Sequence, residues 1–342
     1  MNKIKSILIC LILASCGKQL PEIAPDVVTE KTLHDTDDPA IWVNRENPEQ
    51  SIVFGTDKDT DGAIYAFDLD GKIIESKTMR NFKRPNNVDV EYDVRLSDST
   101  VTDIMIFTER EREQIRIFSV PDLKPLDNGG FKVFQDTREN EMSLPMGISI
   151  YKSPKSKKTY AVVGRKNGPK EGYLHQIELE PAGDHLAPKL VREFGLFSGK
   201  KEIEAIAVDD ELGFIYCADE GDGIRKYYAE PDMGNEELAL FGGEHFNDDI
   251  EGIAIAAYPN GKGQIIVSDQ QEGTFNFFSR EDNSFEYALN LGTTETDGCE
   301  VTTAALGDKF PNGLFVSMND NGEKNFFYHD LSRLKKPEEA EK

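Results

Sequence analysis

An internal repeat of about fifty residues most limits what this 342-residue chain can fold into. Residues 203–208 (IEAIAV) and 250–255 (IEGIAI) are near-copies, and each is followed by a turn and a second strand-like run. Weaker copies extend to both sides, with equivalent positions at 39, 88, 146, 204, 251 and 297 and gaps of 49, 58, 58, 47 and 46 residues. A period near fifty with about four strands in each unit predicts a β-propeller.

Six such units account for nearly all of residues 26–334. We therefore expect one all-β domain, a six-bladed β-propeller of four-stranded antiparallel blades. The last unit runs out of sequence after its third strand, near residues 326–329, whereas residues 26–33 form a strand-like run with no partner. This N-terminal run is expected to supply the missing strand and close the ring, which removes an open sheet edge. Residues 335–342 form a charged tail.

The first residues are expected to direct export rather than to join the fold. Lys3 and Lys5 precede an apolar stretch, residues 7–13, that is too short to span a bilayer. Residues 13–16 (LASC) then resemble a bacterial lipobox, with an ordinary signal peptide as the alternative. The pattern predicts an exported protein, lipid-anchored in the bacterial cell envelope at the outer membrane. It places a signal peptide over residues 1–15, a lipidated Cys16 and a linker over residues 16–25.

Charge and cysteine content exclude some classes of function. The chain carries 63 acidic residues against 39 Lys and Arg, a formal net charge of −24. Such a balance disfavours nucleic acid as a partner and favours cations as ligands. Cys217 and Cys299 remain after removal of the leader, and we expect free buried thiols there, with a disulfide as the alternative. The sequence has no CxxC spacing that would predict zinc, and nothing in it indicates an oligomer, so a monomer is expected.

The propeller geometry brings two sets of residues to one end of the central channel. The start of each blade's first strand and the end of its second strand lie on the same face, because the strands are antiparallel. The first set is acidic or carries an amide: Asp37, Asp38, Asn87, Asp89, Glu204, Asp249, Glu251, Glu295 and Asp297. Turn formation is the alternative role for any one of them. So many like charges at one mouth need a compensating cation, and their hard oxygen ligands suit Ca²⁺.

The second set, at the ends of the second strands, brings basic residues to the same face together with a few acidic and amide residues. It comprises Lys58, Arg110, Arg165, Glu220, Gln270 and Asp320, with Lys166 and Asn319 adjacent. Arginine forks and lysine ammonium groups bind phosphate oxygens, so bound cations beside this basic patch suit a polyanionic phosphate. Salt bridges between blades are an equally good explanation from the residues alone.

An ordered series of short motifs resembles the β-propeller (alkaline) phytases. The segments are DTDDPAIW at 35–42, NNVD at 86–89, Glu204 with DDE at 209–211, ADE at 218–220, DIEG at 249–252 and TDG at 296–298. The match runs from about residue 35 to residue 330, in order and with similar spacings. Each motif is weak alone, but the ordered set is specific.

The resemblance implies a six-bladed propeller that hydrolyses phytate (myo-inositol hexakisphosphate) with several Ca²⁺ ions as cofactor. A metal-activated water would attack phosphorus, with Glu204 and Asp297 as the catalytic carboxylates. The expected phosphate-binding residues are Lys58, Arg110, Arg165 and Lys166. The expected calcium ligands, including two added from the column positions (Asp89 and Asn319), are Asp38, Asn87, Asp89, Glu204, Glu220, Asp249, Glu251, Asp297 and Asn319.

Three departures from the family pattern bear on the substrate. Asp59 follows Lys58 where the family commonly has a second lysine, and Met146 falls where a tyrosine often stands. The acidic loop before Gly298 is also shorter than usual, which would weaken one calcium site. These changes would move the preference towards lower inositol phosphates or other phosphate esters. Two alternatives therefore stay open: a calcium-dependent propeller lactonase, and a non-catalytic envelope lipoprotein that binds phosphorylated ligands.

Overall fold

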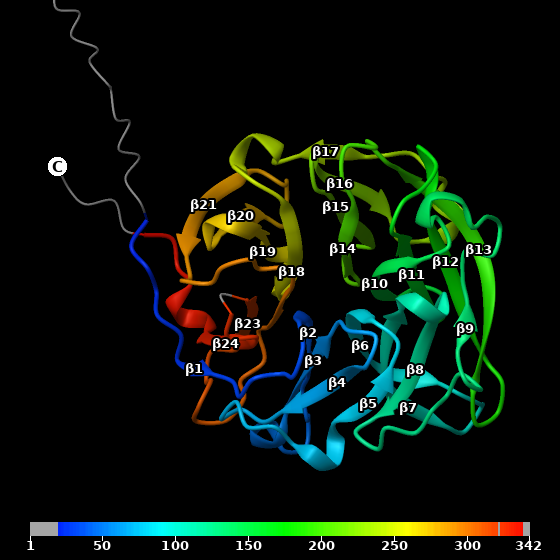
Figure 1. The fold of residues 1–342 in the computed structure, drawn as a ribbon, viewed down its shortest axis with the longest axis horizontal. Coiled ribbons are helices and arrows are strands. Elements are labelled where there is room, and N and C mark those ends of the chain that lie inside the picture. The colour runs from blue at the N-terminus through cyan, green and yellow to red at the C-terminus, as the bar shows by residue number, and fades with distance from the viewer. Residues whose placement is uncertain (1–19, 321, 338–342) are drawn as a thin grey trace, which may run out of the picture.

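A computed structural model describes residues 20–320 and 322–337 of this chain. It confirms the expected fold class: six four-stranded antiparallel sheets surround a central channel (Figure 1). The predicted signal peptide and Cys16, the predicted lipidation site, lie outside the described residues. Within the described ranges, no helix is long and apolar enough to cross a bilayer.

Each of the first five blades is a simple meander in which consecutive strands pair. The first strand of each blade lies innermost and the fourth lies at the rim (Figure 1). The strands of the first five blades are β2–β5 (Thr36–Trp42, Ile52–Asp57, Gly62–Phe67, Met79–Phe82), β6–β9 (Pro85–Arg95, Val101–Glu109, Gln114–Val120, Phe131–Lys132), β10–β13 (Pro145–Lys152, Thr159–Arg165, Glu171–Pro181, Leu186–Leu196), β14–β17 (Ile203–Asp209, Phe214–Asp219, Gly223–Tyr228, Ala239–Phe241) and β18–β21 (Ile250–Tyr258, Lys262–Asp269, Thr274–Ser279, Phe285–Asn290).

The sixth blade closes the ring with the N-terminal strand, as expected from the sequence. Three of its strands come from the C-terminal part of the chain: β22 (Cys299–Thr302), β23 (Leu314–Asn319) and β24 (Asn325–Asp330). The fourth is β1 (Val27–Val28), which pairs with β24 at the rim. Backbone hydrogen bonds from Asp26, Thr29 and Thr32 to carbonyls of the β24 region extend this pairing. His329 Nε2 also bonds to the carbonyl of Ile23 at 3.1 Å. The closure therefore ties both ends of the described chain into one blade.

Apolar side chains fill the gaps between neighbouring blades. The buried residues fall into six clusters, one for each pair of adjacent blades, so every sheet is packed on both faces. This explains why the second and third strands are buried along most of their length rather than at alternate residues. Cys217 and Cys299 belong to two of these clusters and are free thiols, which confirms the prediction made for them.

The remaining elements are turns and short helices at the ends of the strands. Nine 3₁₀ helices occur among the described residues: Pro48–Gln50, Glu75–Lys77, Arg110–Arg112, Glu139–Glu141, Pro231–Met233, Gly243–His245, Pro259–Gly261, Gln270–Glu272 and Leu331–Arg333. Two of them, beginning at Arg110 and Gln270, directly follow the second strand of a blade and face the channel mouth.

Candidate active site

A repeated irregularity near the start of the innermost strands shapes the channel mouth. In blade one, Thr36 pairs with Asp57 and Pro39 pairs with Gly55, so β2 carries one more residue than β3 over this stretch. The same bulge occurs at the same place in β6, β10, β14 and β18. A β-bulge turns side chains away from the regular alternation of a strand. Two consecutive residues in each of these five blades can therefore face the channel.

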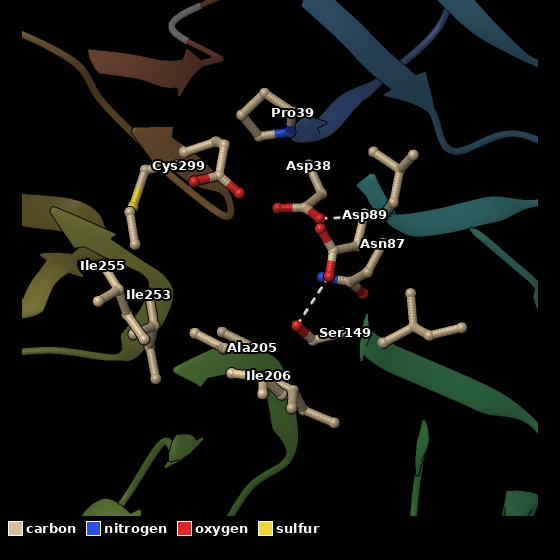
Figure 2. Close-up of a pocket in the computed structure, with 16 residues that line it drawn as sticks. Asp38, Pro39, Asn87, Asp89, Ser149, Ala205, Ile206, Ile253, Ile255 and Cys299 are labelled. Carbon is tan, nitrogen blue, oxygen red and sulfur yellow. Dashed lines mark hydrogen bonds between the residues drawn. The ribbon is translucent and has the colours of Figure 1, made fainter. Parts of the chain in front are cut away.

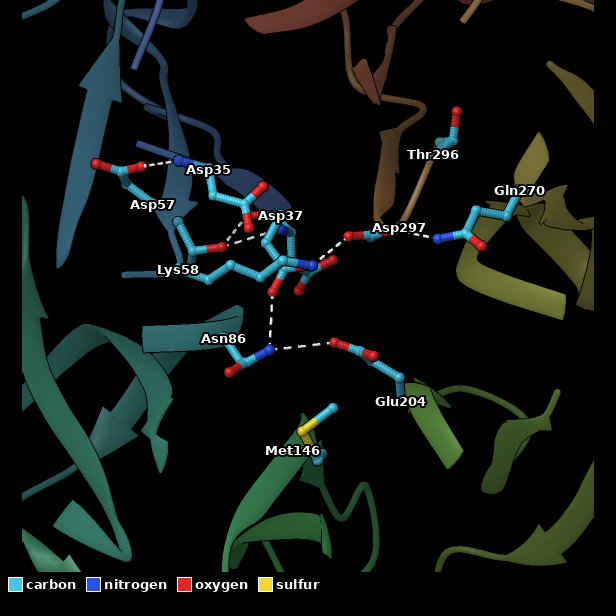
Figure 3. Close-up of polar contacts among 12 residues, drawn as sticks. Asp35, Asp37, Asp57, Lys58, Asn86, Met146, Glu204, Gln270, Thr296 and Asp297 are labelled. Atoms are coloured by element: carbon cyan, nitrogen blue, oxygen red, sulfur yellow. Dashed lines mark hydrogen bonds and ion pairs between the residues drawn. The ribbon is translucent and has the colours of Figure 1, made fainter. Parts of the chain in front are cut away.

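The first residue of each bulge points into the mouth. Figure 3 shows Asp37, Asn86, Met146 and Glu204 facing one another from four blades, with Asp297 joining them from the loop before β22. Blade five contributes Glu251 at the same position of its bulge. One residue from each blade thus forms a ring, which we call the mouth ring: Asp37, Asn86, Met146, Glu204, Glu251 and Asp297.

The second residue of the bulge is small in three blades, where it is Gly147, Ala205 or Gly252, because neighbouring inner strands approach closely there. Gly298, which follows Asp297 of the mouth ring in blade six, is small in the same way. A Cβ atom at Gly147 would lie 1.9 Å from the carbonyl oxygen of Glu204, and one at Gly298 would lie 2.5 Å from Asp38 Oδ1. Gly147 therefore allows the strand that carries Glu204 of the mouth ring to lie close to β10, and Gly298 allows Asp38 of blade one to lie close to the loop before β22.

The bulges correct the alignment of the first two blades. The repeat in the sequence placed 39 and 88 in register with 204, whereas the structure places Asp37 and Asn86 there. The predicted ligands Asp38, Asn87 and Asp89 lie deeper, where they line a channel cavity of about 120 Å³ (Figure 2). The predicted metal ligands are therefore divided between two levels of the channel.

Hydrogen bonds and ion pairs connect the mouth ring to the second set of residues (Figure 3). Lys58 Nζ lies 3.2 Å from Asp37 Oδ1 and also contacts Asp297 Oδ2. Asn86 Nδ2 donates to Asp37 Oδ2 at 3.0 Å and to Glu204 Oε1 at 3.1 Å. Blades one, two, four and six are thereby joined through side chains at the mouth.

Gln270 and Arg110 complete these contacts. Gln270 Nε2 donates to Asp297 Oδ1 at 2.5 Å, so the Asp297 carboxylate is held by blade one through Lys58 and by blade five through Gln270. Arg110 is buried, its Nη2 lies 4.0 Å from Glu204 Oε1, and the same nitrogen contacts the Met146 sulfur. Burial lowers the pKa of Arg110, which the nearby Glu204 carboxylate partly opposes.

Two consecutive residues at the mouth end of each second strand make contacts that recur from blade to blade. The inner member is the last residue of the strand, and the outer member is the residue that follows it. The outer member, such as Lys58, Arg110 or Lys166, donates its backbone N–H to the loop two residues before the mouth ring. In five blades the inner member instead accepts backbone N–H groups from the loop that precedes the mouth ring. It is Asp57, Glu109, Asp219, Asp269 or Asn319.

Arg165 occupies this inner position in blade three. It is 1% exposed and bonds to Asp136 Oδ2 at 3.2 Å and to His175 Nε2 at 3.0 Å, with its guanidinium over the Phe134 ring. Lys166 is the outer member in blade three, equivalent to Lys58 and Arg110, and its side chain contacts Glu202. Of the two predicted phosphate-binding residues on β11 and the adjoining loop, the structure brings Lys166 to the mouth and places Arg165 behind it.

Glu202 is a mouth residue that the sequence motifs did not indicate. Carboxylate oxygens of Glu202, Glu204 and Glu220 lie within 4.8 Å of one another, a group that could hold a metal ion. A signal was available, because Glu202 stands two residues before Glu204 and alternate residues of an extended chain share a side. The predicted ligand Asp249 is tied to Lys201 and lies 3.3 Å from Gln271 Nε2.

The carboxylates of the mouth repel one another. Burial, followed by the charges of neighbouring acids, raises the pKa of Glu220 to about 8 and that of Glu251 well above its ordinary value. Burial also raises the pKa of Asp297 to about 7, although Lys58 opposes this shift. Around neutral pH this region can keep all its carboxylates ionised only if a cation compensates them.

The donor set fits a hard divalent cation. Glu251 is 4% exposed, and its Oε2 has no hydrogen-bond partner within the described part of the chain. An uncompensated buried carboxylate oxygen is costly, and a bound metal removes that cost. Carboxylate and amide oxygens are the ligands that Ca²⁺ takes in proteins.

Deeper in the channel, the acids show the same effect. Burial raises the pKa of Asp89 to about 6 and that of Glu300 to about 8, and it raises the pKa of Asp38 well above the ordinary value. Asp89 Oδ2 accepts hydrogen bonds from Ser149 Oγ at 2.8 Å and from the Ile150 N–H at 2.7 Å (Figure 2 shows the former). These contacts fix Asp89 between blades two and three.

Known proteins were found that are similar to this chain in sequence or in structure. A family model described as Phytase matches residues 17–327. A protein of Bacillus subtilis (strain 168) named 3-phytase is 34% identical over 308 residues, which cover 84% of this chain and 76% of that protein. Among solved structures, the computationally designed Ika8 protein aligns over 86% of this chain and 70% of its own, with a TM-score of 0.43 and 12% identity.

Proposed function

The chain belongs to the phytase family of phosphoric monoester hydrolases, and we propose that it hydrolyses phytate in a calcium-dependent reaction at the channel mouth. The observation that carries this proposal is the meeting of Lys58, Arg110 and Lys166, from three successive blades, with a ring of buried acids. The 34% identical relative named 3-phytase supports the same substrate class.

Calcium would be held chiefly by the group of Glu202, Glu204 and Glu220 together with Glu251, whose Oε2 has no partner among the described residues. We propose Asp38, Asn87 and Asp89 as ligands at a second, deeper level of the channel. Asp249, Asp297 and Asn319 remain predicted ligands, although they do not belong to the group of Glu202, Glu204 and Glu220. When bound, the metal would supply Lewis acidity and a water of lowered pKa.

The basic residues would hold the phosphate in place. Lys58 is fixed by Asp37 and Asp297, and Arg110 is fixed by burial beside Glu204, so neither must be ordered when substrate binds. Positive groups held in this way stabilise charge that develops on a transferring phosphoryl group. We assign Lys166 the same role, and Arg165 the task of positioning Lys166 from behind.

Glu204 and Asp297 are proposed as the catalytic carboxylates. Each contacts a cation and a side-chain amide: Glu204 contacts Arg110 and Asn86, and Asp297 contacts Lys58 and Gln270. Such two-sided contacts orient a carboxylate for binding a metal or for accepting a proton from an attacking water. No side-chain nucleophile is required by this arrangement.

The two alternatives from the sequence differ from the proposal in different ways. A lactone carries no phosphate charge, so a lactonase has no use for three cations at the mouth. A non-catalytic phosphate-binding protein would use the cations but would not turn the substrate over. Catalysis therefore separates this alternative from the proposal.

The test is phosphate release from phytate by the chain lacking residues 1–16, in calcium and then in excess chelator. Release that depends on calcium is the expected result, and binding of phytate without release would contradict the catalytic part. Arg110→Glu should abolish both release and binding. Arg95→Glu is the matched control, because Arg95 lies at the far end of β6, where its exposed side chain bonds to Asp98 and to the Ser97 carbonyl.

Localisation is a separate proposal that depends on the sequence of the leader. We propose that Cys16 is lipidated and anchors the exported enzyme to the cell envelope. Cys16→Ala should release the protein from the membrane fraction, and an unchanged fractionation would contradict the anchor.

A further inference from the structure

One arginine at the mouth belongs to none of the contacts described so far. Arg84 directly precedes β6 and stands two residues before Asn86 of the mouth ring. Its backbone N–H donates to the Asp59 carbonyl at 2.8 Å, and its carbonyl accepts from the Arg110 N–H at 3.0 Å. Its φ is +54°, the left-handed conformation that non-glycine residues rarely adopt. The backbone of Arg84 is thus held between the loops that follow β3 and β7.

The side chain of Arg84 takes no part in the contacts that hold the other cations of the mouth. Across residues 20–320 and 322–337, the Arg84 guanidinium has no hydrogen bond or ion pair. The other cations of the mouth are engaged: Lys58 with two aspartates and Lys166 with Glu202. Arg110 lies 4.0 Å from Glu204.

The electrostatic surroundings place the Arg84 charge beside the mouth. It interacts with the charge of Arg110. Burial lowers the pKa of Arg110, and the positive charge of Arg84 lowers it further. The Arg84 charge also interacts with Asp35, whose carbonyl accepts the Lys58 N–H, and with Asp59, which follows Lys58 in the first blade. Arg84 is half-buried, whereas Arg110 is buried, so Arg84 lies on the outer side of the basic patch.

We infer that Arg84 binds a phosphate group of the substrate, next to the phosphate held by Lys58 and Arg110. This inference rests on the proposed function. Asp59 stands where the resemblance leads one to expect a second lysine, and the Arg84 backbone is bonded to that same residue. Arg84 therefore supplies positive charge at the place where the side chain of Asp59 cannot. A fork of guanidinium donors without a protein partner is suited to a phosphate.

This role predicts that Arg84 favours substrates with several phosphate groups over simple phosphate monoesters. A substrate with several phosphates can occupy the inner cations and Arg84 together, whereas a simple monoester can occupy only the inner cations. Arg84 should therefore strengthen the binding of phytate and leave a monoester such as 4-nitrophenyl phosphate little affected.

The test compares wild type, Arg84→Gln, Arg84→Lys and Arg112→Gln with both substrates in calcium. Loss of a charge-assisted hydrogen bond to a phosphate should raise the KM for phytate roughly tenfold to fiftyfold in Arg84→Gln, with kcat changed less than about twofold. Arg84→Lys should fall between, because it keeps the charge and loses the fork. Arg112 is exposed and already paired with Glu109 at 3.2 Å, so Arg112→Gln should match wild type.

An unchanged KM for phytate in Arg84→Gln would overturn the inference, as would an equal loss with both substrates. Calorimetric titration with phytate in chelator keeps this result separate from the failure of the proposed function. If wild type binds phytate but does not release phosphate, hydrolysis has failed, and weaker binding by Arg84→Gln still supports the assignment. Equal binding by the two proteins refutes it. Melting temperatures equal to wild type show that the variants are folded.

Discussion

Gly147→Ala should damage the active site through the backbone alone. Gly147 is the second residue of the bulge in β10, and it carries no chemistry of its own. An added Cβ would lie 1.9 Å from the Glu204 carbonyl oxygen and 3.0 Å from the Glu204 carbonyl carbon. Because the obstructing atoms are backbone atoms of β14, no side-chain rotation can relieve the contact. The two inner strands must separate instead.

The geometry sets the size of the effect. Restoring a van der Waals contact of roughly 3.2 Å requires β10 and β14 to move apart by more than about 1 Å. Overpacking of this kind costs about 1–3 kcal/mol, which for a domain of this size lowers the melting temperature by roughly 2–6 °C. Displacing a catalytic group by about 1 Å can reduce activity by roughly a hundredfold. Glu204 moves with its own carbonyl, so kcat/KM for phytate should fall by about that factor.

Gly164→Ala is the matched control. Gly164 lies on β11 of the same blade and faces the same neighbouring strand, but a Cβ there would lie 3.4 Å from the Ile203 carbonyl oxygen and from Ile206 Cδ1. That is close to ordinary contact, so its stability and activity should stay near wild type. Thermal unfolding and phosphate release measure both variants. If Gly147→Ala behaves like Gly164→Ala, the close approach of β10 and β14 does not position Glu204.

The remaining predictions concern calcium, acid stability and the basic column. Millimolar Ca²⁺ should raise the melting temperature of wild type, by the equivalent of about 2.7 kcal/mol at a hundredfold excess over Kd, and should raise that of Glu251→Gln less; a wild-type curve indifferent to Ca²⁺ would refute the metal site. Burial lowers the pKa of His329 to about 4 from 6.5, so the unfolded chain takes up the proton first and stability is lost as pH falls from 6.5 towards 4. By pH 5 this amounts to roughly 2 kcal/mol, which His329→Gln should not lose, as denaturant unfolding at pH 7 and 5 would show; parallel losses in the two proteins would contradict the assignment. Lys166→Gln should lower kcat/KM for phytate with little change in melting temperature, whereas Arg165→Gln should lower the melting temperature by leaving Asp136 and His175 without their shared partner; the opposite pattern would return Arg165 to the phosphate site.

Much of the fold could be predicted because its determinants are local and repeated. Alternating apolar runs, turns and a period near fifty recur along the chain, and each unit needs only its neighbours to bury its faces. The unpaired run at 26–33 predicted the closing strand for the same reason, since a fourth strand was missing from the last unit. These features survive errors of one or two residues in alignment.

The candidate site does not tolerate such errors. Moving by one residue along a strand changes which face a side chain occupies, and a bulge changes it again. The repeat alignment is two residues late in blades one and two, where the bulges place Asp37 and Asn86, rather than positions 39 and 88, in register with Glu204. The same kind of error grouped Arg165 with Lys58, although Lys166 is the residue in that column.

The sequence by itself determined the six-bladed ring, its closure and the chemical character of the mouth, because the repeat period and the residue types can be read directly from the chain. Only the tertiary structure decided which of two adjacent residues reaches the channel, and which charges meet. Lys58 and Asp297 are 239 residues apart in the chain and share an ion pair. Arg84 has no such partner among the described residues, although it stands only two residues from the mouth ring. Pairing of this kind depends on strand register and on the distance between blades, and neither is encoded in any one segment.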